Sequence, residues 1–180
     1  DPKAYGLRSP GAIYDAAAPR SIANLPSGQW NRCEIDCNWP RLRVTLNGKL
    51  IHDIAMDTDD AFRYRLRRGY LGIQNIGCRA SFRDIQIRVL PDQAQWTDLL
   101  SSGMEGLRTQ GHADWQVQGD VLTGQGGDGM AFTKAEFASP FELQVWVKTM
   151  VNGNGGVLFH SGPGRVEVQC FNAPDSTNPT

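Results

Sequence analysis

The sequence predicts an all-β fold in which many short strands form a sandwich, and three observations support this. Apolar residues recur at every second position in most segments, which is the pattern of strands with one buried face. The chain contains 20 glycines and 10 prolines, which separate these segments as turns. No segment carries an apolar stripe of helical spacing over three turns, and residues 59–68 are expected to form at most a short turn of helix.

The first strands are predicted at residues 30–37 and 41–50, where apolar and polar side chains alternate. Asn47 and Gly48 then supply a tight hairpin turn, because both residues tolerate a positive φ. The same alternation predicts further strands at residues 69–74, 81–89, 115–124, 141–148, 155–160 and 165–170. Many short strands with frequent turn residues favour a β-sandwich over a helical or mixed fold.

Composition limits the classes of partner. A chain of 180 residues with 40% hydrophobic residues has the size of one domain and can bury a substantial core. The formal net charge of −1 gives no long-range attraction to nucleic acid or to an anionic membrane. No apolar run approaches the roughly 20 residues of a membrane span, and the first residues lack the pattern of a secretion signal. We therefore expect a mature extracellular or periplasmic chain without a membrane span.

The four cysteines allow one or two disulfides. Cys33 and Cys37 lie four residues apart on one predicted strand, so their α carbons should be about 13 Å apart, which is beyond disulfide reach. If a bridge exists, we expect it between Cys37 and Cys78, while buried free thiols are the alternative. A zinc site is disfavoured because no pair has the required spacing together with a second ligand pair.

The stretch from Ile85 to Leu100 decides the domain organisation. A strand pattern ends at Pro91, and a second apolar segment opens at Trp96 after five polar or small residues. Residues 91–95 are therefore either a boundary between two small domains, 1–90 and 96–180, or a tight connection inside one domain.

Motifs in both halves resemble the 3-keto-disaccharide hydrolase family. "GAIYDAAAPR", "SGQWNRCEIDCNWPRLRVTLNGKLIHD", "RRGYLGIQNIG" and "SFRDIQIRVL" are similar to the C-terminal half of that family. "WTDLL", "QVQGDVLTGQGGDGMAFTKAEFASPFELQVWVK" and "GNGGVLFHSGPGRVEVQ" are similar to its N-terminal half. The resemblance implies a concanavalin A-like jelly roll of two antiparallel sheets.

The two halves stand in the reverse of the family's order, and three arrangements fit this. The chain can close on itself as a circular permutant, in which residues 91–95 connect two adjacent strands. It can instead exchange halves with a neighbouring subunit, which propagates a homo-oligomer or filament unless a ring closes. It can also be one frame of a tandem array, and all three satisfy the same strand pairings.

Two residues of the last predicted strand are the first functional candidates. Val166, Val168 and Cys170 share one face of this strand, and Glu167 and Gln169 share the other. The resemblance implies that this Glu-x-Gln pair faces the concave cleft, with Glu167 catalytic and Gln169 binding substrate. The structural alternative is an ordinary solvated face of an edge strand.

Four further residues are site candidates, three from the resemblance (Arg8, Tyr14 and His160) and one, Trp146, from the face of its strand. Arg8 is a candidate to stabilise a developing oxyanion, and Tyr14 to stack on a sugar or donate a proton. His160 shares the face parity of Leu158 and is a candidate acid or metal ligand, although relatives carry Arg at this position. Trp146 lies on the polar face of its strand, where its ring suits carbohydrate stacking.

The function that the resemblance implies is cleavage of a 3-keto glycoside. A base removes the acidic C2 proton, the glycosidic oxygen leaves by elimination, and water then adds. Carbohydrate is the expected partner; no cofactor is certain, no metal ligands are assigned, and a divalent cation is an alternative oxyanion partner. The competing hypothesis is a non-catalytic building block or glycan-binding module of an extracellular assembly, because "IQNIG" and His160 depart from the family pattern.

Overall fold

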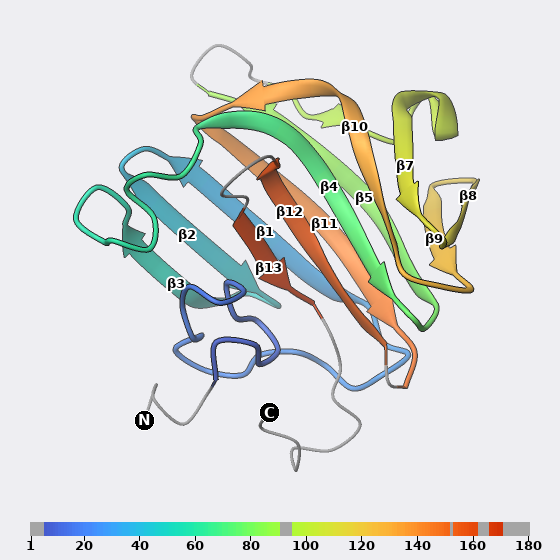
Figure 1. Cartoon of the computed structure of the whole chain (residues 1–180), viewed down its shortest axis with the longest axis horizontal. Coiled ribbons are helices and arrows are strands. Elements are labelled where there is room, and N and C mark those ends of the chain that lie inside the picture. The colour runs from blue at the N-terminus through green and yellow to red at the C-terminus, as the bar shows by residue number, and fades with distance from the viewer. Residues whose placement is uncertain (1–5, 91–94, 152, 162–165, 171–180) are drawn as a thin grey trace.

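The computed structural model describes residues 6–90, 95–151, 153–161 and 166–170. Within these residues the chain folds into two antiparallel sheets, one of eight strands and one of five. The five-stranded sheet lies in front of the eight-stranded sheet in Figure 1. The predicted all-β sandwich, with the two antiparallel sheets that the jelly-roll resemblance implies, is confirmed.

The larger sheet has the order β3-β2-β1-β11-β5-β9-β8, and β6 pairs with β5 beside this path. Its strands are β1 (Asn31–Asn38), β2 (Arg41–Leu46), β3 (Lys49–Ala55), β5 (Ala80–Val89), β6 (Thr97–Asp98), β8 (Asp114–Gln118), β9 (Val121–Gln125) and β11 (Phe141–Thr149). The smaller sheet has the order β13-β12-β4-β10-β7. It consists of β4 (Arg68–Ile76), β7 (Leu107–Gly111), β10 (Gly129–Ala138), β12 (Asn154–Ser161) and β13 (Val166–Gln169), and a short 3-10 helix (Gly103–Gly106) precedes β7.

The alternation in the sequence places one face of each strand in the core. Every second residue of β1 and of β11 is buried, with half-exposed polar residues between them. The buried apolar side chains of both sheets form one continuous cluster. Each fully buried aliphatic or aromatic side chain contributes about 1.5–3 kcal/mol of transfer free energy, so this shared core is what holds the sheets together.

The predicted hairpin turn between β2 and β3 is present. Asn47 has a φ of 50° and Gly48 a φ of 79°, as a two-residue turn of this type requires. The Asn47 side chain also accepts a hydrogen bond from the backbone N–H of Arg32 on the adjacent strand (2.9 Å). This contact fixes the turn against β1.

Strands from the two halves of the sequence alternate in both sheets. In the larger sheet β11 lies between β1 and β5, and in the smaller sheet β4 lies between β12 and β10. The strands on either side of the 91–95 connection, β5 and β6, pair with each other antiparallel. Residues 91–94 of that connection lie outside the described residues. Within one chain the halves therefore complete each other, while the permuted order relative to the family stays a prediction.

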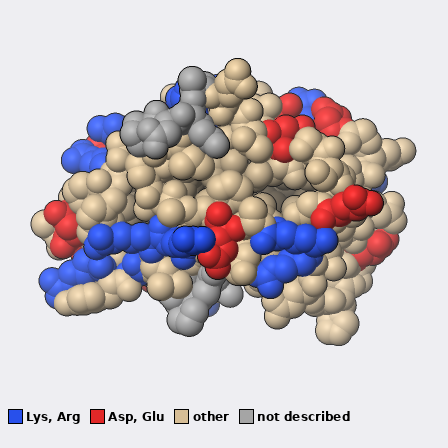
Figure 2. Space-filling model, turned by 90° about the horizontal axis from the view of Figure 1, so that it is seen from above, with Lys and Arg blue, Asp and Glu red and all other residues tan. Residues whose placement is uncertain are grey.

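Charges of both signs lie side by side at the surface. Seen from above, lysine and arginine side chains are interspersed with aspartate and glutamate (Figure 2). On the outer face of the larger sheet, Arg88, Glu142, Asp36, Arg43 and Asp53 are direct cross-strand neighbours from β5 to β3. Oppositely charged neighbours in this row form ion pairs, which favour this register of the strands.

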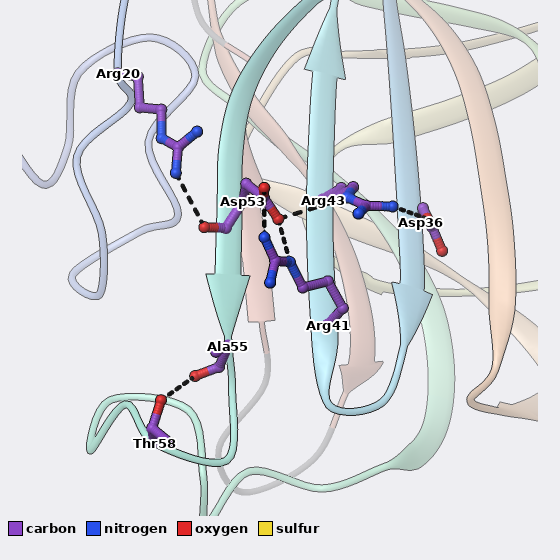
Figure 3. Close-up of polar contacts among 7 residues, drawn as sticks. All are labelled: Arg20, Asp36, Arg41, Arg43, Asp53, Ala55 and Thr58. Carbon is purple, nitrogen blue, oxygen red and sulfur yellow. Dashed lines mark hydrogen bonds and ion pairs between the residues drawn. The ribbon is translucent and has the colours of Figure 1, made fainter.

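Asp53 is the most connected member of this row. Its carboxylate accepts two bonds from the Arg41 guanidinium and lies 3.5 Å from Nε of Arg43 (Figure 3). Arg20 of the N-terminal loop donates to the backbone carbonyl of Asp53 at 3.2 Å. Burial and the carboxylate of Glu142 on the neighbouring strand together raise the pKa of Asp36. The Asp36 carboxylate forms a long ion pair with the Arg43 guanidinium, at 3.7 Å. The charge of Asp53 is thus matched by Arg41 and Arg43 within the fold.

The expected bridge between Cys37 and Cys78 is wrong. Cys37 pairs with Phe141 at one end of β11, whereas Cys78 precedes Ala80, which pairs with Thr149 at the opposite end of that strand. Eight residues of extended strand span roughly 26 Å, far beyond disulfide reach. All four cysteines are free thiols.

No helical segment within the described part of the chain is long and apolar enough to cross a membrane.

Interleaved strands predict that neither half folds alone. Residues 1–90 and 96–180, expressed separately, should each lack a cooperative thermal transition, because their central strands lose the partners that cover their apolar edges and faces. Mixing the two fragments should restore the circular dichroism spectrum and a single melting transition. A cooperative transition in either isolated fragment would show that residues 91–95 separate two independent domains.

Candidate functional site

The N-terminal segment adds a strand-like edge to the smaller sheet. The backbone N–H of Gly11 donates to the carbonyl of Gln169 (2.8 Å), and the N–H of Gln169 donates to the carbonyl of Ala12 (2.8 Å). The N–H of Tyr14 donates to the carbonyl of Glu167 (2.9 Å). This ladder covers the backbone of β13 on the side away from β12 and sets Tyr14 opposite Glu167.

His52 anchors this segment to the larger sheet. Its Nε2 lies 2.7 Å from the carbonyl of Gly11, which accepts a hydrogen bond from the ring. His52 is buried, and this burial lowers its pKa, which favours the neutral ring. Gly11 has a φ of +84°, and a Cβ there would lie 3.0 Å from Cδ1 of Ile51, so the position suits glycine.

Two rows of side chains cross the outer face of the smaller sheet beside this edge. Val166 and Val168 of β13 belong to the core, so Glu167 and Gln169 point to the other side. The register then continues the rows through β12, β4 and β10. One row holds Tyr14, Glu167, Leu158, Gly72 and Phe132; the other holds Gln169, Gly156, Gln74 and Met130.

Gly156 lies beneath the side chain of Glu167 and between two glutamines in the sheet. A Cβ at this position would lie only 2.7 Å from Oε1 of Glu167, so the carboxylate of Glu167 leans over the glycine. Gln169 and Gln74 are the direct cross-strand neighbours of Gly156 on either side. Glu167, Gln169 and Gln74 are 4%, 3% and 7% exposed. A carboxylate and two amides thus share a mostly dry patch, which contradicts the expectation of an ordinary solvated edge.

Gln169 is oriented by a neighbour on β12. Its Nε2 donates to Oδ1 of Asn154, while its Oε1 is buried and lacks a hydrogen-bond partner among the described residues. A buried acceptor without a partner costs about 1–3 kcal/mol.

Arg8 and Tyr14 lie at the rim of the patch. The Arg8 guanidinium forms two hydrogen bonds with the carboxylate of Asp15, at 2.8 and 3.2 Å, and lies 5.2 Å from the ring centroid of Tyr14. Bonding to Arg8 holds the pKa of Asp15 below its ordinary value. The Arg8 side chain is 60% exposed, so its remaining donors are accessible from solvent.

His160 does not share the face of Leu158. The register between β12 and β4 shifts after Leu158, and His160 lies in this bulge with a φ of 51°. Its ring packs edge-on against Phe141 and Phe159, with centroids 5.5 and 5.4 Å apart, and is 3% exposed. The extra residue turns His160 into the core, away from Glu167. Burial lowers the pKa of His160 to about 4.

Trp146 lies on the other sheet. It stands on the outer face of β11 in the eight-stranded sheet, where Arg83 lies over its ring at 5.6 Å and over Trp30 at 4.4 Å. The two sheets turn their outer faces in opposite directions, so Trp146 and Glu167 cannot contact one small substrate. The structure thus brings together Glu167, Gln169, Tyr14 and Arg8, and it separates Trp146 and His160 from them.

Sequence reasoning did not select Gln74, Tyr70 or Arg108. Tyr70, Gly72 and Gln74 alternate with apolar residues in the predicted strand 69–74. This alternation indicates that Tyr70 and Gln74 share the non-core face of the strand. Arg108 lies over the ring of Tyr70 at 4.1 Å and over that of Phe132 at 5.2 Å, at the far end of the rows. Arg108 is far from Tyr70 and Phe132 in the sequence. Its position along the chain therefore does not predict these contacts.

Within the described ranges, no three His, Cys, Asp or Glu side chains gather into a group able to hold a metal ion. The polar atoms at Gly156 come from one carboxylate and two amides, which bind sugar hydroxyls readily.

Comparison with known families identifies the N-terminal half of the chain. Residues 2–88 match the 3-keto-alpha-glucoside-1,2-lyase-like domain. For residues 2–88 the resemblance read from the sequence is thereby confirmed, and this matched part contains Arg8, Tyr14 and Gln74. For residues 96–180 the resemblance stays a prediction. Glu167 and Gln169 lie outside the matched residues. No curated protein matches the chain.

Burial of His160 predicts an acid-dependent loss of stability. The folded ring titrates at about 4 and an unfolded histidine at about 6.5, so at pH values above 6.5 both states are neutral. As the pH falls from 6.5 to 4, the unfolded chain binds the proton first, which lowers the free energy of unfolding by up to about 3 kcal/mol. His160→Asn, which tolerates the positive φ, should flatten this slope in urea unfolding measured at several pH values.

His112→Asn is the matched control, because His112 is exposed. It should leave the slope unchanged. An equal slope in the His160 variant and the unsubstituted chain would mean that His160 is not buried as a neutral ring.

Proposed function

We propose that the chain cleaves 3-keto glycosides, with Glu167 as the base that removes the C2 proton. The observation that carries this proposal is the carboxylate of Glu167 over Gly156, whose cross-strand neighbours are Gln169 and Gln74, with Tyr14 opposite Glu167. Arg8 lies next to Tyr14. The family match of residues 2–88 supports the substrate class. Pairing of residues 11–14 with β13 joins this matched part to the strand that carries the base.

The reaction begins with proton transfer. A ketone at C3 acidifies the proton on C2, and a carboxylate takes this proton while the electron pair forms an enolate whose charge lies on the C3 oxygen. The enolate then expels the glycosidic oxygen from C1, which leaves an unsaturated sugar and, after protonation, an alcohol. Addition of water across the new C1–C2 double bond returns the proton to C2 and completes net hydrolysis.

The residues around Gly156 suit these steps. Glu167 is held in a nearly dry patch. Little water therefore surrounds its carboxylate and competes with it for the substrate proton. The amide groups of Gln74 and Gln169 can bind hydroxyls or the C3 oxygen, and Arg8 can stabilise the developing enolate charge. Tyr14, opposite Glu167, can donate the proton that the leaving oxygen needs. His160 has no part in this proposal, because its ring lies in the core.

A second candidate function is a non-catalytic glycan-binding module or a building block of an extracellular assembly. The low exposure of Glu167 and the separate position of Trp146 favour it, because a binding module needs no reachable base. The interleaved halves support a closed single chain, whereas exchange of halves between copies would give an oligomer or filament. An extracellular or periplasmic location likewise stays a proposal, and light scattering of the purified chain tests the oligomeric alternative.

Glu167→Gln tests the base directly. The substitution keeps the size of the side chain but removes the carboxylate, so turnover of a 3-keto glucoside should fall by about 10²- to 10⁴-fold. Binding of the same compound, measured by calorimetry, should change little. Undiminished turnover would exclude Glu167 as the base.

Trp146→Phe is the matched control, since Trp146 lies on the opposite outer face. It should retain the full rate. Tight binding of the 3-keto glucoside without any turnover by the unsubstituted chain would favour the binding module.

A further inference from the structure

A hollow of about 140 Å³ opens on the outer face of the larger sheet, and we call it the β8–β9 hollow. Its lining consists of five polar side chains from β8, β9 and the residue that precedes β5: Arg79, Gln116, Gln118, Thr123 and Gln125. β8 and β9 form the end of this sheet that is farthest from β3, at the right of Figure 1. The hollow therefore belongs to a different sheet from Glu167.

The alternation of β8 and β9 turns the lining side chains away from the core. Trp115 and Leu122 are core residues, so the residues of opposite parity, which include Gln116 and Thr123, point outward. The register places Gln116 directly opposite Thr123. A Cβ on Gly124 would lie only 2.7 Å from the Trp115 ring, so this ring packs against β9 from the core side. The hollow thus stands on a hairpin that is fixed from below.

The lining has hydrogen-bonding groups that the fold does not use. The Gln116 amide donates to the Asp114 carboxylate at 2.9 Å, and the hydroxyl oxygens of Thr123 and Ser81 are 3.2 Å apart. Three lining side chains form no hydrogen bond or ion pair with any residue that the structure describes: Arg79, Gln118 and Gln125. A ligand can bond to these groups without breaking a contact of the fold.

The charges around the hollow are close to balanced. Ala80 pairs with Gly124, which sets the preceding Arg79 beside Gln125. Asp114 is the cross-strand neighbour of Gln125 on its other side. One cation and one carboxylate thus flank Gln125, and this favours a neutral ligand over an anionic one.

Sugar hydroxyls match the groups in the lining. A glutamine amide offers two donors and an acceptor oxygen, a threonine hydroxyl donates and accepts, and a guanidinium offers a fork of donors. Each sugar hydroxyl also donates and accepts, so a sugar can satisfy this mixture. A phosphate dianion only accepts, and it would leave the amide oxygens without a donor. The hollow is smaller than pockets that enclose a drug-sized ligand, so it suits a single sugar unit.

An aromatic and a cationic side chain lie further along the same face. Lys148 of β11 is the cross-strand neighbour of Ser81, and Ser81 is that of Thr123. The Lys148 ammonium lies 4.6 Å from the ring centroid of Trp30, and both residues are half-buried. Strands spaced about 4.8 Å apart put β11 roughly 10 Å from β9. A sugar chain with one unit in the hollow can therefore extend to Trp30 and Lys148.

We propose that the β8–β9 hollow binds one unit of a neutral oligosaccharide, whose following units run across β5 toward Trp30. The amides, the hydroxyl and the Arg79 guanidinium bond to the hydroxyls of that unit. One unit makes few contacts in an open hollow, so binding depends on several linked units. The site can hold a glycan while the smaller sheet stays free, and the proposal does not depend on the proposed catalytic function.

The test titrates the isotope-labelled full chain with maltohexaose, cellohexaose and mannohexaose, and records backbone amide shifts and calorimetric affinity. We expect at least one of them to bind and to shift the amides of β8 and β9, with little change in β13. The double variant Gln118→Ala/Gln125→Ala removes two exposed amides and should weaken this binding by about 10-fold. Gln110→Ala is the matched control, because it removes an exposed glutamine side chain from β7 of the smaller sheet. It should leave the affinity unchanged.

Four results would overturn the proposal. The first is that none of the three oligosaccharides binds, and the second is that the amide shifts fall only on the smaller sheet. The third is a double variant that binds as tightly as the unsubstituted chain. The fourth is tighter binding of hexagalacturonate than of every neutral chain, because that would make the site one for acidic sugars.

Discussion

The antiparallel pairing between residues 11–14 and β13 is the contact on which the candidate site depends. Three backbone hydrogen bonds of 2.8–2.9 Å join the first described segment of the chain to its last described strand. Without them β13 would be an open edge, and Arg8 and Tyr14 would have no fixed relation to Glu167. His52 supports the pairing from the larger sheet, so the site is coupled to the integrity of the whole sandwich.

The two outer faces of the sandwich differ in how deeply they bury polar groups. On the larger sheet, most polar residues of the row from Arg88 to Asp53 are partly exposed, and oppositely charged neighbours form ion pairs across the strands. On the smaller sheet, Glu167, Gln169 and Gln74 are buried. Each face has a buried acceptor without a partner among the described residues, Oδ1 of Asp36 on the larger sheet and Oε1 of Gln169 on the smaller one. The depth of burial of a carboxylate and two amides is therefore what distinguishes the smaller sheet.

Local alternation predicted the strands well, because burial on one face depends only on the period of two. It placed β1, β11 and the Asn47-Gly48 hairpin correctly, and it put Glu167 and Gln169 on the face opposite Val166 and Val168. Parity alone does not reveal which sheet a strand joins. Trp146, selected from parity, was therefore expected in one cleft with Glu167 although the two residues belong to different sheets.

The remaining errors arise where long-range packing overrides a local pattern. One extra residue in the bulge of β12 turns the side chain of His160 to the opposite face of the strand. The sequence pattern of "VLFHSGPG" does not predict this bulge. The neighbours of the four cysteines depend on the order of strands in both sheets, so the Cys37 to Cys78 bridge could not be tested from spacing.

In the proposed function, the smaller sheet's outer face, organised by residues 11–14 and β13, binds the sugar. Titration of the isotope-labelled chain with a 3-keto glucoside, followed by backbone amide chemical shifts, locates the binding face. Binding at the smaller sheet should shift the amides of Tyr14, Gln74 and the residues of β13, with little change around Trp30 and Trp146. Changes confined to Trp30, Trp146 and their neighbours on the larger sheet would contradict it.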